Sequence, residues 1–322
     1  MKYGFIIAGL LLSGCASVDT RMPEITPSME AAERTEQETL AFSEVRRLRN
    51  HLSQVSAPIL AANTALCPKI RYDIGARTHK LSNYPKAIRK GAAREMGAKE
   101  YPTLSYILMN SPASKAGLKP GDELLGDGET SLDVTSKAFQ NVLASGGPLR
   151  IRRDGSVMDV DIVPEQKCGY DIKLAVTSDI NAYATGKTIT VTSGMMNFVK
   201  SDEELALIIG HELAHNTMSH IRKSITNYIL SGMATRYTRP FESEADYVGM
   251  YYMVRAGYNP NNVEDVWRRL ALVNLKAVAR AKTHPTYPNR YLSLAATRDE
   301  IEDKQASGAP IIPNFKSSEP KS

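Results

Sequence analysis

The first long pattern of apolar positions begins near residue 30. From Glu30 to Leu66 the chain has no glycine and a single proline, Pro58. This pattern predicts a long amphipathic helix, with a bend near Pro58, that packs against a globular domain. Its apolar residues recur mostly three and four positions apart, at Leu40, Phe42, Val45, Leu48, Leu52, Val55, Ile59 and Leu60.

The pattern changes to alternation in the middle of the chain. Leu149 and Ile151 alternate with polar residues, and past a turn at Asp154-Gly155 the same holds for Val157, Val160 and Ile162. This predicts a β-hairpin, preceded by a helix over 136–143. We therefore expect a separate β-rich module at residues 85–166, inserted after an N-terminal helix and lead-in at 30–84.

Helical patterns return after residue 200. Ser201 is a candidate N-cap for a buried helix, and acidic residues follow it, which suits a helix N-terminus. Further helical runs follow at 247–256 and 291–303, and short alternating segments precede them at 181–191. These elements predict an α+β protein with a mainly helical domain and a small β-sheet at residues 167–303.

Composition narrows the function classes. The 322 residues are 42% hydrophobic and 23% charged, with a net charge of +5 and scattered basic residues. This gives no electrostatic footprint for nucleic acid. The proline-containing residues 15–29 suggest a tether, and residues 304–322 suggest a disordered tail.

The N-terminus has the pattern of an export signal. A basic Lys2 precedes a short apolar run over 3–12, too short to span a bilayer. The following Leu12-Ser13-Gly14-Cys15 resembles a bacterial lipobox, which implies a signal peptide at 1–14, lipidation of Cys15 and a lipid anchor in the membrane. Ala16 after it resembles the sorting pattern for the periplasmic side of the outer membrane. The alternative is an ordinary secretory signal with a chance cysteine.

Two cysteines remain, Cys67 before the β-rich module and Cys168 just after it. In an oxidising compartment a disulfide between them is the simplest pairing, and two buried free thiols are the alternative. A disulfide at these positions would hold the inserted module at its base.

The candidate chemistry lies on the buried helix, in the motif His211-Glu212-Leu213-Ala214-His215. Positions i and i+4 of a helix share a face, so both imidazoles can reach one Zn²⁺ ion. Glu212 emerges beside them, where it can take a proton from a zinc-bound water. His220 lies about two and a half turns further on, which would place it on another face, and we interpret it as structural.

A third zinc ligand is expected downstream. Glu242 and Asp246 are four residues apart and share a helix face, whereas Glu244 points elsewhere. One carboxylate of the pair can bind the metal while the other orients a ligating imidazole. Spacing alone leaves their order open.

The region from about Ile180 to Leu294 resembles the zinc metallopeptidase family of HtpX and the CAAX prenyl proteases (metallopeptidase family forty-eight). More narrowly, it is similar to the soluble periplasmic lipoprotein branch that includes BepA and LoiP. The resemblance rests on 202–206, the H-E-x-x-H motif, E-x-x-x-D on the next helix and 257–260. It implies a zincin-type, gluzincin-like domain with one Zn²⁺ per chain, Glu242 as ligand and Asp246 as the residue that orients an imidazole.

Two further segments resemble this family. The run Asn181-Ala182-Tyr183-Ala184 is similar to the family's strand beside the active site, which would bind an extended substrate; an internal strand is the alternative. His284 and Arg290 resemble the family's late His-Pro segment. The resemblance implies that these two side chains stabilise the oxyanion; a packed helix N-terminus is the alternative.

The segment 111–125, with Ser-Pro-Ala and Gly-Leu-Lys-Pro-Gly-Asp, is similar to the centre of PDZ domains of bacterial envelope proteases. The resemblance implies a PDZ-like module that captures a peptide by adding a strand to a sheet edge, with an envelope protein as a further partner. A purely structural β module is the alternative.

Together these features predict a zinc endopeptidase of the bacterial cell envelope that cleaves misfolded or unassembled proteins. The rival hypothesis is a periplasmic chaperone or assembly scaffold with a latent zinc site, in which a side chain such as His284 takes the metal's fourth position.

Overall fold

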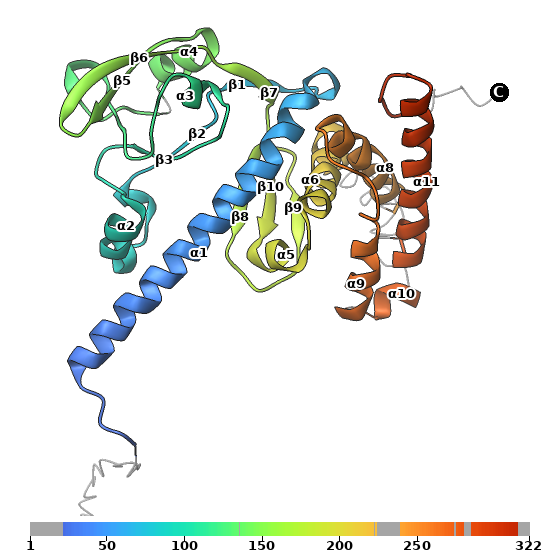
Figure 1. Cartoon of the computed structure of the whole chain (residues 1–322), viewed down its shortest axis with the longest axis horizontal. Coiled ribbons are helices and arrows are strands. Elements are labelled where there is room, and N and C mark those ends of the chain that lie inside the picture. The colour runs from blue at the N-terminus through green and yellow to red at the C-terminus, as the bar shows by residue number, and fades with distance from the viewer. Residues whose placement is uncertain are drawn as a thin grey trace, which may run out of the picture.

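The computed structural model describes residues 22–134, 136–221, 223, 239–273, 275–279 and 285–314. In these ranges the protein has mixed helix and sheet, arranged as a helical body and a β-rich insert connected by the long helix α1 (Figure 1). The expected signal peptide, the lipidation site Cys15 and His284 lie outside the described residues.

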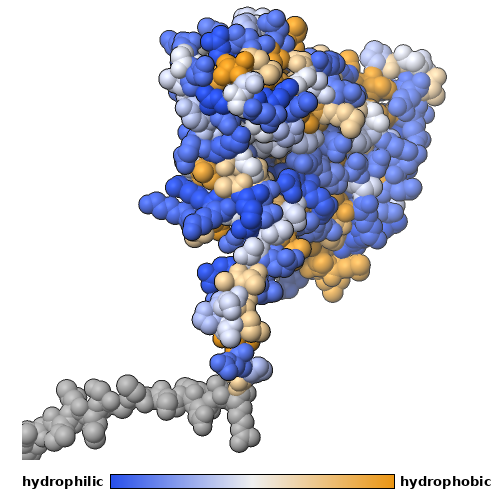
Figure 2. All heavy atoms as spheres, turned by 60° about the vertical axis from the view of Figure 1, so that its left-hand side comes forward, coloured by the Kyte–Doolittle hydropathy of each residue, from blue (hydrophilic) through white to orange (hydrophobic). Residues whose placement is uncertain are grey.

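Helix α1 (Pro27–Ala62) begins where Thr26 caps it: the Thr26 hydroxyl accepts the backbone N–H of Met29 at 3.3 Å. The helix continues through Pro58 without interruption. Residues 22–37 are exposed, and this part of the helix stands clear of a largely polar molecular face (Figure 2). Most of the apolar positions further along are buried against the body, but Leu40 is exposed.

The insert is attached by a two-stranded stem, in which β1 (Ile70–Asp73) pairs antiparallel with β7 (Glu165–Cys168). Its five-stranded antiparallel sheet has the order β2-β3-β4-β5-β6. The strands are β2 (Ala76–His79), β3 (Thr103–Ile107), β4 (Glu123–Leu124), β5 (Gly147–Arg153) and β6 (Ser156–Ile162), and the helices are α2 (Arg89–Met96), α3 (Pro112–Lys115) and α4 (Lys137–Ser145).

Strand β2 differs from the sequence expectation, because we expected the insert to begin at residue 85. The strand has only four residues, two of them charged or imidazole side chains, so no alternation marks it. Its pairing partner β3 lies more than twenty residues further on, and only this pairing assigns β2 to the sheet.

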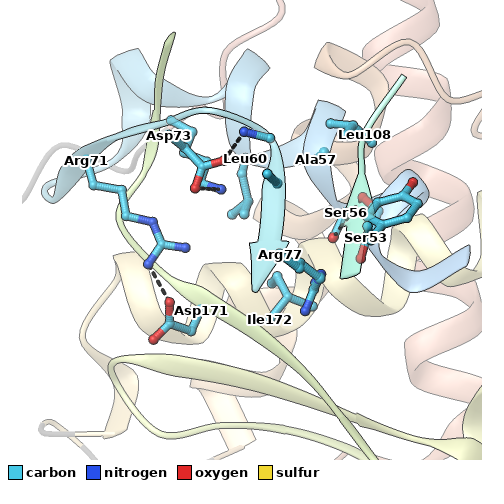
Figure 3. Close-up of a pocket in the computed structure, with 14 residues that line it drawn as sticks. Ser53, Ser56, Ala57, Leu60, Arg71, Asp73, Arg77, Leu108, Asp171 and Ile172 are labelled. Atoms are coloured by element: carbon cyan, nitrogen blue, oxygen red, sulfur yellow. Dashed lines mark hydrogen bonds and ion pairs between the residues drawn. The ribbon is translucent and has the colours of Figure 1, made fainter. Parts of the chain in front are cut away.

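Cys67 and Cys168 form a disulfide at the base of the stem, with a Cα–Cα distance of 5.6 Å. A cleft of about 170 Å³ lies between α1, the stem, β2 and β8 (Figure 3). Two ion pairs cross this region, Arg71 with Asp171 and Lys167 with Asp73. Covalent and ionic contacts therefore fix the point where the chain leaves and re-enters the body.

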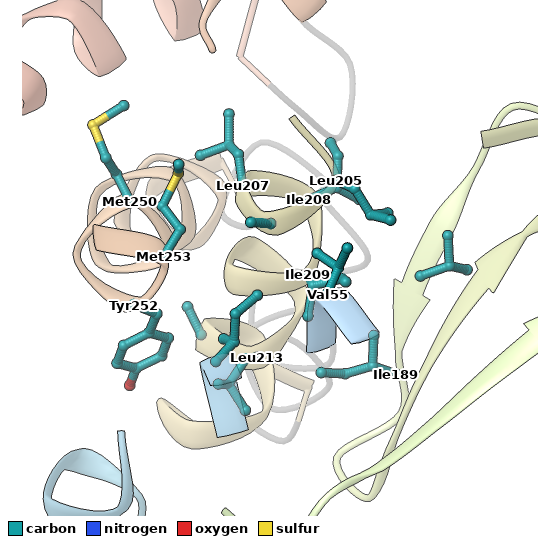
Figure 4. Close-up of a cluster of buried hydrophobic side chains, with 14 of the residues drawn as sticks. Val55, Ile189, Leu205, Leu207, Ile208, Ile209, Leu213, Met250, Tyr252 and Met253 are labelled. Carbon is teal, nitrogen blue, oxygen red and sulfur yellow. The ribbon is translucent and has the colours of Figure 1, made fainter. Parts of the chain in front are cut away.

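The body contains a three-stranded sheet of order β8-β10-β9, in which β10 is parallel to β8 and antiparallel to β9. Helix α6 crosses it and is buried between α1, β10 and α8, where Val55, Ile189 and Met250 surround it (Figure 4). The elements are β8 (Asp171–Ala175), β9 (Ala182–Ala184), β10 (Thr188–Thr192), α5 (Ser193–Phe198), α6 (Asp202–Thr217), α8 (Arg239–Arg255), α9 (Asp265–Val273), α10 (Lys276–Ala279) and α11 (Tyr287–Ala306).

Among the described helices, none is long and apolar enough to cross a membrane. The segment after α11, which we expected to start a disordered tail, is held in place as far as Asn314. Lys304 Nζ donates to Ile312 O at 2.6 Å, and the Asn314 backbone N–H donates to the Tyr247 hydroxyl at 2.8 Å. These contacts are non-local, so a polar, proline-containing sequence does not reveal them.

We expect the double variant Cys67→Ala, Cys168→Ala to lose about 2–5 kcal/mol in the free energy of unfolding, because the disulfide closes a long loop in the unfolded chain. The two cysteines are separated by 101 positions. Guanidinium denaturation of the variant and of the wild type, with and without reductant, measures the loss. A wild type whose midpoint does not move on reduction would contradict the expectation.

Candidate metal centre

Helices α6 and α8 touch backbone to backbone at two glycines. A Cβ atom added to Gly210 would lie 2.4 Å from the carbonyl oxygen of Gly249, and one added to Gly249 would lie 2.5 Å from the amide nitrogen of His211. No side chain fits there without moving the helices apart. This contact places the two histidines of α6 opposite the carboxylates of α8.

The start of α6 is set by its own sequence. The Ser201 hydroxyl accepts the backbone N–H of Glu204 at 3.3 Å, and the Glu204 carboxylate accepts the backbone N–H of Lys200 at 2.8 Å. These bonds satisfy donors that a helix N-terminus leaves unpaired. From this start, the helix presents His211 and His215 on one face, one turn apart.

Three donor atoms converge between the helices. The Nε2 atoms of His211 and His215 are 3.1 Å apart, and each lies 3.5 Å from a carboxylate oxygen of Glu242. One ligand atom from each of these residues falls within 4.8 Å of the other two. Both histidines are buried, so two imidazole nitrogens and one carboxylate oxygen face a common point away from bulk water.

Asp246 contacts the Nδ1 side of the His211 ring, whereas Glu242 faces its Nε2 side. Its Oδ1 atom is 2.9 Å from His211 Nδ1, while Arg290 of α11 donates to both carboxylate oxygens, at 2.7 and 2.5 Å. The guanidinium of Arg290 is stacked on the ring of Trp267, with its Cζ 3.5 Å from the centroid. The donors of Arg290 are thus directed at Asp246, in contrast to the oxyanion contact that we expected from the sequence.

The charges of the site are strongly coupled. Burial lowers the pKa of His211, but hydrogen bonds to Asp246 and Glu242 outweigh it and raise this pKa to about 9. Burial raises the pKa of Glu242, but both histidines hold it well below its usual range. Without a metal, a protonated imidazole therefore occupies a position between two carboxylates, and a cation that binds there must displace that proton.

Glu212 is buried beside these groups, and burial raises its pKa against the opposing influence of His211 and His215. Its carboxyl therefore holds a proton more readily than an exposed glutamate does, as a general base requires.

His220 contacts the site, which the sequence analysis missed. Helix α6 ends at Thr217 and Ser219 takes a left-handed conformation with φ of 58°, so His220 does not continue the helix face. Its Nδ1 lies 3.1 Å from His215 Nδ1, and its Nε2 lies 2.9 Å from a carboxylate oxygen of Glu244. The prediction that His220 lies away from the site, which assumed an unbroken helix, is wrong.

Strand β9 lies next to α6 and forms one edge of the body's sheet, within the described part of the chain. It contains Ala182, Tyr183 and Ala184, and Asn181 immediately precedes it. The turn after it is tied to α6, because the backbone N–H of Gly186 donates to the Asn216 side chain at 2.6 Å. The segment expected to bind substrate is thus an edge strand beside the helix that carries the two histidines.

Comparison with known proteins is consistent with this geometry. Residues 156–234 and 225–298 match the model of peptidase family M48. The body of this chain therefore matches peptidase family M48. The M48 match covers the body from its sheet to α11, including all of the residues that converge between α6 and α8.

The relatives include the mitochondrial metalloendopeptidase OMA1 of Arabidopsis thaliana, 24% identical over 65% of this chain and 48% of the relative. A beta-barrel assembly-enhancing protease of Yersinia pestis is 22% identical over 52% of this chain and 46% of the relative. The chain spans about half the length of these two relatives. A solved HtrA3 PDZ domain, bound to a phage-derived ligand, covers 31% of this chain and 92% of its own, with 22% identity and a TM-score of 0.24.

We expect Gly249→Ala to lower the free energy of unfolding by about 1–3 kcal/mol, because the added methyl group overpacks the contact between α6 and α8. It should also weaken metal binding, since Glu242 and Asp246 move with α8. Thermal unfolding and metal titration measure the two effects. Gly126→Ala is the matched control: its added Cβ meets nothing closer than 3.3 Å. Equal losses in both variants would show that the helix contact is not responsible.

Proposed function

We propose that this protein is a zinc-dependent endopeptidase of the bacterial cell envelope that cleaves misfolded or unassembled proteins. The observation that carries the proposal is the meeting of His211, His215 and Glu242 beside the buried Glu212. Two imidazole nitrogens and a carboxylate oxygen are a donor set typical of catalytic zinc, which keeps a further position open for water or substrate.

In this proposal His211, His215 and Glu242 would hold the metal. A bound zinc ion would polarise the carbonyl of the scissile peptide bond and make a nearby water more acidic. Asp246 accepts the proton on His211 Nδ1, so the Nε2 atom, which faces Glu242, is the one that would bind the metal. Arg290 in turn holds Asp246 in this position, so we assign Arg290 a positioning role instead of an oxyanion contact.

Glu212 would act as the general base for the attacking water and then return the proton to the leaving amine nitrogen. The first step requires an ionised carboxylate that accepts the proton of the water, and the second requires the protonated carboxyl to release it to the amine. Its burial, which raises the pKa, favours this exchange.

Substrate would bind as an extended strand along the free edge of β9, with backbone hydrogen bonds that do not depend on sequence. Tyr183 on this strand is half exposed, and β9 is an outer strand of the sheet that the described residues form, which supports this placement of the substrate. The insert would capture unfolded chains as a PDZ-like peptide-binding module. The names of both relatives support proteolysis. The beta-barrel assembly-enhancing protease, unlike the mitochondrial metalloendopeptidase, also supports the cell envelope as the setting.

We expect Glu212→Gln to reduce the rate of cleavage of a denatured envelope protein by about 10²–10⁴-fold, the range for loss of a general base. Zinc content, measured by atomic emission, should stay at one ion per chain, because Glu212 is not among the proposed ligands. Glu203→Gln on the same helix is the control and should cleave like the wild type. Undiminished cleavage by Glu212→Gln would exclude the mechanism.

The proposal also places the protein on the periplasmic side of the outer membrane, anchored by lipid at Cys15. We expect the wild type produced in a Gram-negative host to incorporate labelled palmitate and to sediment with outer membranes. Cys15→Ala should carry no label, because acyl chains attached at this cysteine supply the membrane affinity. Labelling that persists in Cys15→Ala would place the lipid elsewhere.

A further inference from the structure

The two histidines of α6 have different partners on the side that faces away from Glu242. His211 Nδ1 lies against a carboxylate, at 2.9 Å from Asp246. His215 Nδ1 lies against another imidazole, at 3.1 Å from His220 Nδ1, and the far nitrogen of that ring lies 2.9 Å from Glu244. A carboxylate is therefore linked to each histidine, directly for His211 and through one intervening ring for His215.

The ring protons of His215 and His220, which form a hydrogen-bonded series with Glu244, can be assigned by starting from the metal site. His215 Nε2 faces His211 and Glu242, so it must be free of a proton to bind a metal. A neutral imidazole carries one proton, which then sits on His215 Nδ1. His220 Nδ1 must accept it, so the proton of His220 is on Nε2, where the Glu244 carboxylate accepts it. The opposite tautomer of His220 would direct two N–H groups at each other.

The ring of His220 is held in a fixed orientation. It is almost fully buried and stacks on Phe241, with centroids 4.9 Å apart and an interplanar angle of 21°. Phe241 directly precedes Glu242, and Glu244 follows two residues later. One short stretch of α8 thus supplies the proposed metal ligand Glu242, the ring of Phe241 that stacks on His220, and the carboxylate of Glu244 that accepts the proton of His220.

We propose that His220 and Glu244 are positioning residues that hold His215 in the tautomer whose Nε2 binds the metal. The inference rests on the proposed function, since it concerns the same metal. Removal of His220 leaves the buried Nδ1–H of His215 without its acceptor, which favours the other tautomer and a rotated ring. Without His220 the metal therefore binds more weakly, although the three ligand residues themselves are unchanged.

Zinc affinity, measured by competition with a chromogenic chelator, tests the positioning role of His220. We expect His220→Leu to bind zinc about 10- to 100-fold more weakly than the wild type, the range for loss of a hydrogen-bond partner of a metal ligand. His220→Asn places an oxygen where Nδ1 was and should recover part of the affinity. His51→Leu is the matched control, because His51 also pairs with a carboxylate, Asp202 at 2.6 Å, on the far end of α6.

Glu244 provides a second pair of variants that does not disturb the core, because its side chain is 38% exposed. Glu244→Gln keeps an acceptor oxygen for His220 and should bind zinc like the wild type. Glu244→Leu removes the acceptor and should bind several-fold more weakly. A purely structural role predicts equal affinities for the two.

Long-range nitrogen–proton correlation spectra of the zinc-loaded protein give an independent readout. We expect the ring proton of His215 on Nδ1 and that of His220 on Nε2. A His220 proton on Nδ1, or full zinc affinity in His220→Leu, overturns the inference and leaves the proposed function standing. Failure of the wild type to bind zinc overturns both.

Discussion

The contact between Gly210 and Gly249 determines where the whole site lies. Two helices usually cross with their axes 8–10 Å apart because side chains separate them. Here the backbones meet directly, and the amide nitrogen of His211 itself lies within van der Waals reach of Gly249. Glu242 and Asp246, on the same helix as Gly249, are thereby brought within hydrogen-bond or ligand distance of the two histidines. A larger residue at either glycine would increase every one of these distances.

The close contact of α6 and α8 also brings several charged side chains together in a buried volume. Glu212, Glu242 and Asp246 supply three carboxylates, and Arg290 is the cation whose donors are bonded to one of them. Unpaired buried charges are costly, so the arrangement is stable only if the remaining carboxylates meet protons or a metal. The raised pKa of His211 shows that a proton can compensate the carboxylates, and a bound dication would compensate them in its place. The stacking of Arg290 on Trp267 leaves its edge directed at Asp246.

Helix α1 joins this centre to the insert. Toward its C-terminal end it is buried against α6 and α8, and nearer its start it bonds to α2 of the insert. There the Thr39 hydroxyl and the Arg46 guanidinium both reach Glu95, each at 2.9 Å. The disulfide and the β1–β7 stem hold the other end of the insert. A module fixed at two places has a defined orientation relative to the edge strand β9, as the proposed delivery of an extended chain requires.

Much of the site follows from local sequence. The spacing of His211 and His215 places them on one helix face wherever that helix lies, and Ser201 marks its start, because both depend on interactions within a few residues. The insert's hairpin was likewise visible, since its Asp154-Gly155 turn adopts the positive φ angles that such residues favour. Strand β2 was not, because its partner is remote and its own pattern is too short.

Only the tertiary structure shows where each carboxylate lies relative to the two histidines. Spacing left Glu242 and Asp246 equivalent, whereas the crossing of α6 and α8 puts Glu242 before the Nε2 atoms and Asp246 behind His211. The contacts of Arg290 with Asp246 and of His220 with His215 depend on where α11 docks and where α6 ends. The sequence by itself determined the helix that carries His211 and His215. The close contact of two glycines, distant along the chain, determined the rest, because distances between helices are set by packing and not by periodicity.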